Sequence, residues 1–407
     1  MEGNEMLEYL AFPLAAFAVA TLPSAPASDK KKIKKIFENV GYGIRKKDQF
    51  QTPKFAKKFP IMDGEERIGT KYLFSVPLGL PATKMKHFEE EMHIFSDGLK
   101  KPVIIEFNKF LNVNVYDKEI PAMFPYAEIP DREGWVIPLG RSLDGMIWHN
   151  FDHTPHMTAA GATRFGKTVF LKMMMTYLIE HHPEDVEFYV IDLKGGLEFG
   201  RYERIEQVKG IASNSVEAAE MLDNIMKSVR ADYAVFKKKH WSNVVNTQYR
   251  KRRFIVVDEA AQMAPEKWMG KEEKKLLGYC QHALGEIARV AGALGYRLIY
   301  ATQYPTADTL PRQIKQNSDA KITFRLPSGY ASQVAIDDKG AEELPSDVKG
   351  RALFKTHEIK ELQVPYISNE EMRERLERYQ KPITLEGEAG NVVEKTATHG
   401  TNLVEFR

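Results

Sequence analysis

The chain has 407 residues, which is enough for two or three domains with cores of their own. A hydrophobic share of 43% and a charged share of 28% are those of an ordinary soluble globular protein. The net charge of +2 is too small for the electrostatic field of the whole protein to attract nucleic acid, so any such contact must come from local basic patches. The single cysteine, Cys280, excludes an internal disulfide framework and suits a reducing cytoplasm.

An uncharged stretch runs from Tyr9 to Ser28, and its part from Leu10 to Leu22 is almost wholly apolar. Acidic residues precede it where a signal peptide would be basic: Glu2, Glu5 and Glu8. Two interpretations remain open. The stretch is either a membrane anchor, with the lysines of Lys30 to Lys35 keeping the next domain cytoplasmic, or an oligomerisation or core helix before a solvated linker. We assign residues 1–35 to this segment and linker.

The next part of the chain, residues 36–130, has the pattern of a small α+β domain without a catalytic constellation. It is expected to serve as a scaffold or ring-stacking module. Its predicted elements are a basic, proline-containing loop at 50–70, a strand at Thr70 to Pro77, a helix at Thr83 to Leu99, and a hairpin of Val103 to Phe107 with Leu111 to Val115.

A phosphate-binding loop is predicted between Gly161 and Thr168, which fit the pattern G-x-x-x-x-G-K-[ST]. A short apolar strand, Met157 to Ala160, precedes it, and Val169 to Glu180 follows with the period of a helix. The glycines allow backbone N–H groups to face a polyphosphate at the helix N-terminus. The residues expected to bind ATP are Gly161, Ala162, Thr163, Arg164, Phe165, Gly166, Lys167, Thr168 and Val169, with Lys167 on the β- and γ-phosphates and Thr168 on Mg²⁺.

Strands and helices then alternate, which predicts an α/β fold with a parallel sheet and helices on both faces. We assign residues 131–380 to this domain and 381–407 to a flexible tail. The predicted strands are Trp135 to Gly140, Gly145 to Asn150, Val186 to Asp192, Phe254 to Glu259, Tyr296 to Gln303 and Lys321 to Leu326, and the predicted helices are Val216 to His240 and Leu284 to Gly295.

Acidic and amide side chains follow two of these strands at the edge where open α/β sheets bind ligands. Asp258 is expected to hold Mg²⁺ directly or through water, and Glu259 to orient and deprotonate the attacking water. Gln303 is expected to bond the γ-phosphate or the water and so to sense hydrolysis, although a strand-end polar cap is the alternative.

These motifs resemble the FtsK/SpoIIIE family of DNA-pumping motors over residues 130–375. The resemblance rests on Gly161–Thr168, Ile191–Lys194, Val257–Glu259, Gly295–Pro305, Ile314–Asn317, Gly340–Glu342 and Gln363–Ser368. It implies a RecA-like P-loop ATPase domain, a hexameric ring, double-stranded DNA in a central channel, and ATP hydrolysis between subunits. Arg164-Phe165, and Val76 to Gly79 in the preceding domain, are more similar to the branch of conjugative elements, which includes coupling proteins.

The resemblance also implies an arginine finger that acts on the neighbouring subunit. The family's positions hold Lys321 and Gln333 here, so Arg325 on the same strand is the first candidate and Lys321 the second, because a guanidinium spreads its contacts over a phosphoryl group. For DNA, the resemblance favours the loop with Arg312 and Lys315. The rival is the basic segment from Lys237 to Arg253.

The sequence therefore predicts a DNA translocase of plasmid or mobile-element transfer, cytoplasmic or at the inner face of the cell membrane. Its expected partners are DNA, further copies of the chain, and a relaxase or secretion channel. Two alternatives stay open. One is a viral or plasmid packaging, replication or partition motor, and the other is a non-translocating assembly protein that uses ATP only to close a ring, against which Glu259 argues.

Overall fold

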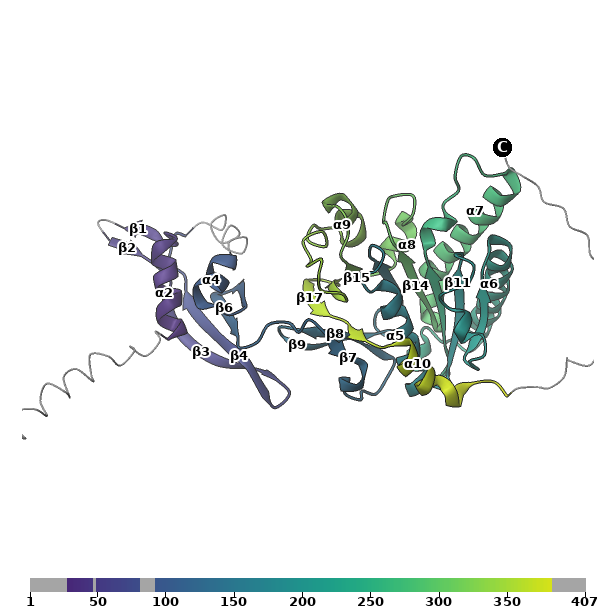
Figure 1. The fold of residues 1–407 in the computed structure, drawn as a ribbon, viewed down its shortest axis with the longest axis horizontal. Coiled ribbons are helices and arrows are strands. Elements are labelled where there is room, and N and C mark those ends of the chain that lie inside the picture. Colours follow the sequence, from purple (N-terminus) through teal and green to yellow (C-terminus); the bar gives the residue numbers. More distant parts are fainter. Residues whose placement is uncertain (1–27, 47–48, 81–91, 383–407) are drawn as a thin grey trace, which may run out of the picture.

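The computed structural model describes residues 28–46, 49–80 and 92–382. They form a smaller body within residues 29–116 and a larger body within residues 124–379, joined by an extended segment (Figure 1). The predicted anchor stretch at 9–28, apart from Ser28, and nearly all of the predicted tail lie outside the described residues. Within the described ranges no helix is long and apolar enough to cross a membrane.

The smaller body is a four-stranded antiparallel sheet with two helices packed on one face (Figure 1). Its sheet order is β3 (Lys54–Asp63), β4 (Glu66–Ser75), β6 (Phe110–Tyr116) and β5 (Val103–Asn108), and the helices are α2 (Asp29–Asn39) and α4 (Met92–Leu99); β1 (Ile44–Lys46) pairs with β2 (Gln49–Gln51). Every second residue of β6, including Val113, points into the core against Phe37 and Phe95. The predicted strand and hairpin are confirmed, and the predicted helix is described only from Met92 onward.

The loop predicted at residues 50–70 is wrong, because β3 and the start of β4 occupy most of it. Strand β3 lies at the edge of the sheet and is exposed along most of its length. Its side chains therefore do not alternate between apolar and polar, and the sequence gives no sign of a strand. Pro60 is tolerated there, since an edge strand leaves part of its backbone N–H groups outside the ladder. A strand without a buried face lacks the period that sequence analysis detects.

The larger body contains a ten-stranded sheet whose first six strands are parallel, as predicted. In spatial order these are β12 (Val208–Ala212), β11 (Val186–Asp192), β13 (Arg252–Asp258), β14 (Tyr296–Thr302), β10 (Met157–Ala160) and β15 (Ala320–Phe324). The sheet continues, antiparallel, through β16 (Arg351–Lys355), β17 (Ile359–Gln363), β8 (Val136–Ser142) and β9 (Gly145–Asn150). The sequence predicted a parallel sheet but not its edge strand β12, nor β16 and β17.

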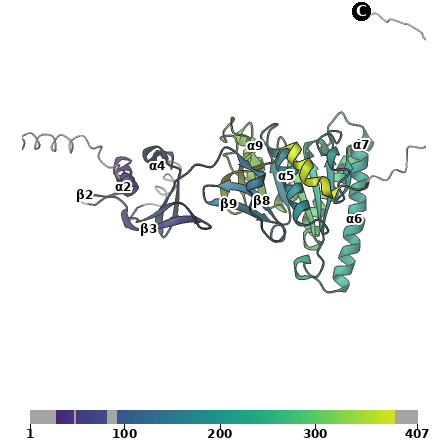
Figure 2. The ribbon, with the colours of Figure 1, turned by 60° about the horizontal axis from the view of Figure 1, so that its bottom comes forward.

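Helices cover both faces of the parallel part. On one face lie α5 (Lys167–His181) and α10 (Asn369–Leu376); on the other lie α6 (Ser215–Lys238) and α7 (Lys271–Glu286), at the end far from the smaller body (Figures 1 and 2). The shorter helices are α8 (Arg312–Gln316) and α9 (Gly329–Ile336). The helix predicted at 284–295 begins earlier, at Lys271. The sequence did not indicate its first turns because they are charged and exposed. It continues past Glu286 as a π turn and a 3₁₀ turn.

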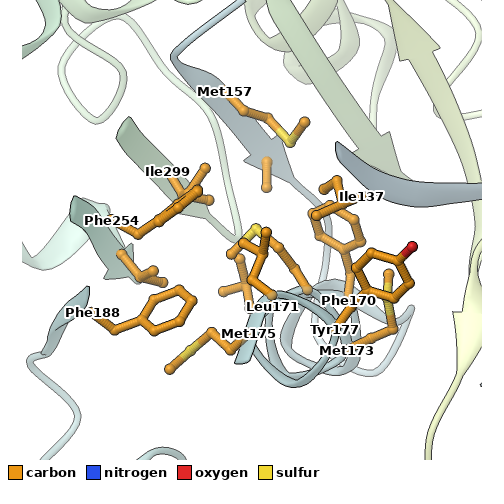
Figure 3. Packing of buried hydrophobic residues seen from close by; sticks show 14 of the residues in the cluster. Ile137, Met157, Phe170, Leu171, Met173, Met175, Tyr177, Phe188, Phe254 and Ile299 are labelled. Carbon is orange, nitrogen blue, oxygen red and sulfur yellow. The ribbon is translucent and has the colours of Figure 1, made fainter. Parts of the chain in front are cut away.

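Helix α5 is buried on nearly all sides, which explains why its sequence is apolar all round. Leu171 and Met175 pack toward Phe254 and Ile299 of the sheet, while Phe170 and Tyr177 pack near Ile137 of β8 (Figure 3). Strand β18 (Pro365–Tyr366), which pairs with β7 (Phe124–Pro125), and α10 close the remaining side. The helix that follows the phosphate loop is thereby fixed in the core.

The extended segment between the two bodies joins the larger one before residue 130. Strand β7 pairs with β18, and Tyr126 donates a hydrogen bond to Glu180 of α5 at 2.6 Å. We therefore propose a domain division between Tyr116 and Phe124, ahead of the predicted boundary at 130. The bodies also touch, since Tyr116 is hydrogen-bonded to Asp144 and Arg141 lies 3.7 Å from Asp63.

Two buried histidines make the stability of the larger body dependent on pH. Burial lowers the pKa of His149 and of His156 to about 3, and the Nε2 atom of each has no hydrogen-bond partner. Below the ordinary histidine value of about 6.5 the unfolded chain binds protons that the folded chain does not. Both contributions are complete above that value and are lost as the pH falls from there toward 3.

We therefore expect the free energy of unfolding to fall between pH 6.5 and pH 5 by up to about 1.4 kcal/mol per pH unit for each histidine. Urea unfolding at pH 7.5, 6 and 5 measures this. His156→Gln should reduce the slope, while His153→Gln, at an exposed position, should leave it unchanged. Equal slopes in the unaltered chain and the His156→Gln variant would contradict the assignment.

Candidate active site

The predicted phosphate loop spans the gap between β10 and α5, and backbone groups of neighbouring strands hold it in place. Ala162 N donates to Arg325 O at 3.0 Å, and Gly350 N donates to Phe165 O at 3.0 Å. A Cβ at Gly161 would lie 2.7 Å from the Phe324 side chain, so only glycine fits there. Gly166 has a φ of 115° directly before the first residue of α5, a conformation that favours glycine.

Lys167 and Asp258 form an ion pair at the end of the loop, with side chains that are 3% and 2% exposed. Lys167 is the first residue of α5, and Asp258 is the last residue of β13. The parallel sheet delivers both to one edge, because β10 and β13 flank β14. A buried ion pair lacking either partner is costly, so each charge keeps the other in the site.

Glu259 follows Asp258 with a φ of 58°, a left-handed conformation that turns its side chain back along the sheet edge. Its Oε2 accepts a hydrogen bond from Lys194 Nζ at 3.0 Å, and its Oε1 accepts one from Gln303 N at 3.3 Å. Gln303 Oε1 in turn accepts a hydrogen bond from Thr163 Oγ1 of the phosphate loop at 2.9 Å. The candidate base and the candidate sensor are thus joined to the phosphate loop.

A cavity of about 810 Å³ opens over these groups, within the range of small-ligand sites. The predicted residues that line it are Ala162, Thr163, Arg164, Gly166, Lys167, Thr168, Val169, Asp258 and Gln303. Gly161, Phe165 and Glu259 are predicted site residues that do not line it. The other lining residues, to which sequence analysis gave no role at the site, are Ala122, Met123, Lys172, Lys194, Glu198, 347–350, 363–369 and Met372.

The residues present fit Mg²⁺. Thr168 offers a hydroxyl and Asp258 a buried carboxylate on the same cavity, and both are oxygen donors of the kind that this ion prefers. No group of three or more acidic, histidine or cysteine side chains that could hold a metal occurs in the described ranges. Thr168 and Asp258 would hold the ion, which would supply positive charge to offset that of the phosphates.

Neither candidate for the arginine finger projects freely from the surface. Arg325 is half-buried behind the phosphate loop of its own chain, and its guanidinium donates to Leu344 O. Lys321 is buried on β15, 3.8 Å from Asp337, and burial lowers its pKa. Of the two, Arg325 lies next to the nucleotide cavity, because the carbonyl of the same residue holds Ala162.

The two candidate DNA segments differ in how much charge they leave exposed. Arg312 is exposed on α8, whereas Lys315 is half-buried and forms an ion pair with Asp337 at 2.6 Å. In the rival segment all four basic residues of 250–253 are paired with acids of the larger body; the acids are Asp185, Glu187, Asp152 and Asp232. Lys237, Lys238 and Lys239 remain exposed at the end of α6.

A mostly parallel sheet that carries a phosphate loop, a buried lysine–aspartate pair and a following glutamate at one edge defines a P-loop ATPase fold. Within the larger body, residues 134–266 match the FtsK/SpoIIIE family. The chain is 26% identical over 341 residues to DNA translocase FtsK of Leptospira interrogans, and 29% identical over 259 residues to DNA translocase FtsK of Lactococcus lactis.

The alignments cover 77% and 58% of this chain, and the chain spans 34% and 32% of the length of those two relatives. Among solved structures, the pCW3 conjugation coupling protein TcpA, in a monomer form with ATPγS, aligns with a TM-score of 0.61 at 21% identity. That alignment covers 86% of this chain and 99% of TcpA. At this identity the likeness shows the fold, which here extends over both bodies.

Proposed function

We propose that the chain is an ATP-hydrolysing, ring-forming translocase that moves double-stranded DNA in the transfer of a plasmid or mobile element. The observation that carries this proposal is that Lys167, Asp258 and Gln303 line one cavity, while Glu259 is hydrogen-bonded to Gln303 and to the lining residue Lys194. Lys167 and Thr168 bind the polyphosphate with Mg²⁺, and Glu259 takes the proton of the attacking water. The relatives named DNA translocase support DNA as the substrate, and the likeness to a conjugation coupling protein supports the transfer role.

The proposed ring requires a residue that reaches the active site of the neighbouring subunit. We propose Arg325 as the residue that completes the site of the neighbouring subunit, because a guanidinium is suited to a phosphoryl group and Arg325 is already tied to the phosphate loop of its own chain. Its guanidinium would exchange the Leu344 carbonyl for the neighbour's nucleotide. A relaxase or secretion channel would be the further partner, and the uncharged stretch at 9–28 supports a place at the inner face of a membrane.

The proposal is tested by ATP hydrolysis of the full chain with linear duplex, with single strands, and without DNA. Stimulation by duplex together with displacement of a triplex-forming strand from that duplex is the expected result. Hydrolysis that duplex stimulates without strand displacement would favour the assembly protein. Hydrolysis that neither form of DNA changes would contradict the translocase.

The main DNA-binding surface is predicted to lie at α8, with Arg312 and Lys315. Arg312→Ala combined with Lys315→Ala should weaken binding to every duplex alike, because phosphate contacts are blind to sequence, and the salt slope should fall by roughly one unit for each phosphate that the variant no longer neutralises. Basal ATP hydrolysis should persist while its stimulation by duplex declines. Affinity is measured by fluorescence anisotropy at several salt concentrations.

Single variants sharpen this prediction, because the two side chains differ in their surroundings. Arg312→Ala should account for most of the loss of affinity, since Lys315 is occupied by Asp337. Lys237→Ala with Lys238→Ala, on the exposed end of α6, is the matched control. If only the control pair weakened binding, the DNA-binding surface would be assigned to the Lys237–Arg253 segment instead.

A further inference from the structure

We propose that Lys194 is a positioning residue for hydrolysis, which holds the Glu259 carboxylate in the orientation needed to receive a proton from water. This inference rests on the proposed ATPase function and adds a residue to its site. Lys194 lies on the loop after β11, lines the cavity, and has a side chain that is 35% exposed. It acts through Glu259 and not on the reacting atoms.

The Glu259 carboxylate has one donor on each oxygen, and the donors come from the two strands that flank its own. Lys194 Nζ, beyond the end of β11, lies 3.0 Å from Oε2, and Gln303 N, beyond the end of β14, lies 3.3 Å from Oε1. The side chain is 7% exposed, so water does not compete freely for these positions. Two donors on opposite sides fix the plane of a carboxylate that a single donor would leave free to rotate.

The loop that carries Lys194 is itself fixed at both ends. The buried Asp192 accepts hydrogen bonds from Lys194 N at 3.2 Å and from Glu198 N at 3.3 Å. Gly195 and Gly196 adopt left-handed conformations that let the loop fold back over Asp192. Glu198 then pairs with Lys172 of α5 at 2.7 Å. A lysine on a loop held in this way presents its ammonium at a defined place, as positioning requires.

A second interpretation of Lys194, as a direct phosphate ligand, predicts a different result. The cavity already contains Lys167 on the phosphate loop, and the Lys194 ammonium lies against Glu259. A phosphate ligand would lower the Kd for nucleotide, whereas a positioning residue changes kcat and leaves the Kd alone. The two interpretations therefore separate in one pair of measurements.

The test compares Lys194→Met and Lys194→Arg with the unaltered full chain, using ATPγS binding, steady-state hydrolysis and the thermal midpoint. Lys209→Met is the control, because the Lys209 side chain is exposed on β12 and its ammonium donates a hydrogen bond to Glu206 O alone within the described chain. For Lys194→Met we expect a fall in kcat of about 10- to 100-fold with an unchanged Kd. Lys194→Arg should recover most of the rate, and Lys209→Met should match the unaltered chain.

A double variant shows whether Lys194 acts through Glu259. In a Glu259→Gln background, single-turnover hydrolysis should not fall further when Lys194→Met is added, because the group that it positions is gone. An equal further fall would assign Lys194 a structural role and overturn the inference, as would a raised Kd for ATPγS. If Lys194→Met kept full turnover while Glu259→Gln was inactive, this inference alone would be overturned. If the unaltered chain showed no turnover, the proposed function would fall as well.

Discussion

Replacing Glu259 with glutamine should leave nucleotide binding intact while ATP turnover falls by about 10²- to 10⁴-fold. The amide retains the size of the side chain and an oxygen that can accept from Lys194 Nζ or Gln303 N, but it is not a base at neutral pH. The change therefore removes proton transfer and keeps the arrangement of the sheet edge. ATPγS titration and steady-state phosphate release measure the two effects separately.

Lys167→Ala is the contrasting variant, because it removes the main charge on the β- and γ-phosphates. It should abolish nucleotide binding, and it also leaves the buried carboxylate of Asp258 without its cation. The thermal midpoint must be recorded beside the binding curve to separate these effects. A normal rate of hydrolysis in Glu259→Gln would show that the base is another group.

The largest effect on stability is expected at the opposite edge of the sheet. Asp152 accepts hydrogen bonds from Arg252 Nε and from Arg297 Nη2, both at 2.8 Å, and the two arginine side chains are 5% and 1% exposed. Burial acts to raise the pKa of Asp152, but hydrogen bonds from both guanidinium groups outweigh it and lower the pKa. Burial lowers the pKa of Arg297 to about 10, so this group stays charged at neutral pH.

Asp152→Ala should therefore lower the free energy of unfolding by about 3 kcal/mol, because it leaves two buried cations without a carboxylate. The value lies at the low end of the usual range, since backbone carbonyls still accept from both arginines. Urea unfolding with an unchanged m-value measures it. Arg250→Ala is the control: Arg250 pairs with Asp185, but its side chain is 82% exposed, so a change of no more than about 0.5 kcal/mol is expected. Equal destabilisation by the two variants would contradict the assignment.

The sequence predicted the phosphate loop and its flanking strand and helix because each signal lies within a short segment. Asp258 and Glu259 could be placed because an apolar strand ends at them, and parallel strands end at a common edge. The role of Lys194 could not be predicted. Its partner lies on a different strand, and the contact depends on the backbone turn at Glu259.

The basic run at 250–253 shows the converse case. In the sequence it is an exposed cluster of charge, yet each of its residues meets an acid contributed by a distant segment, such as Asp152 or Glu187. Likewise, the cavity wall at 347–350 and 363–369 flanks β16 and β17, two strands that the sequence did not predict. Spacing along the chain contains no information on such pairings.

The order of strands in the large sheet also constrains how the chain is made. Strand β8 leaves the ribosome before the phosphate loop, yet its neighbour β17 is among the last strands to emerge. Arg141 of β8 can pair with Gln363 of β17 only after that. Until then the hairpin of β8 and β9 has an unpaired edge, and apolar side chains such as Ile137 lack part of their cover. Such late, long-range closure is slow and exposes the nascent chain to aggregation, so this protein should depend on chaperones during synthesis more than its short, local motifs would indicate.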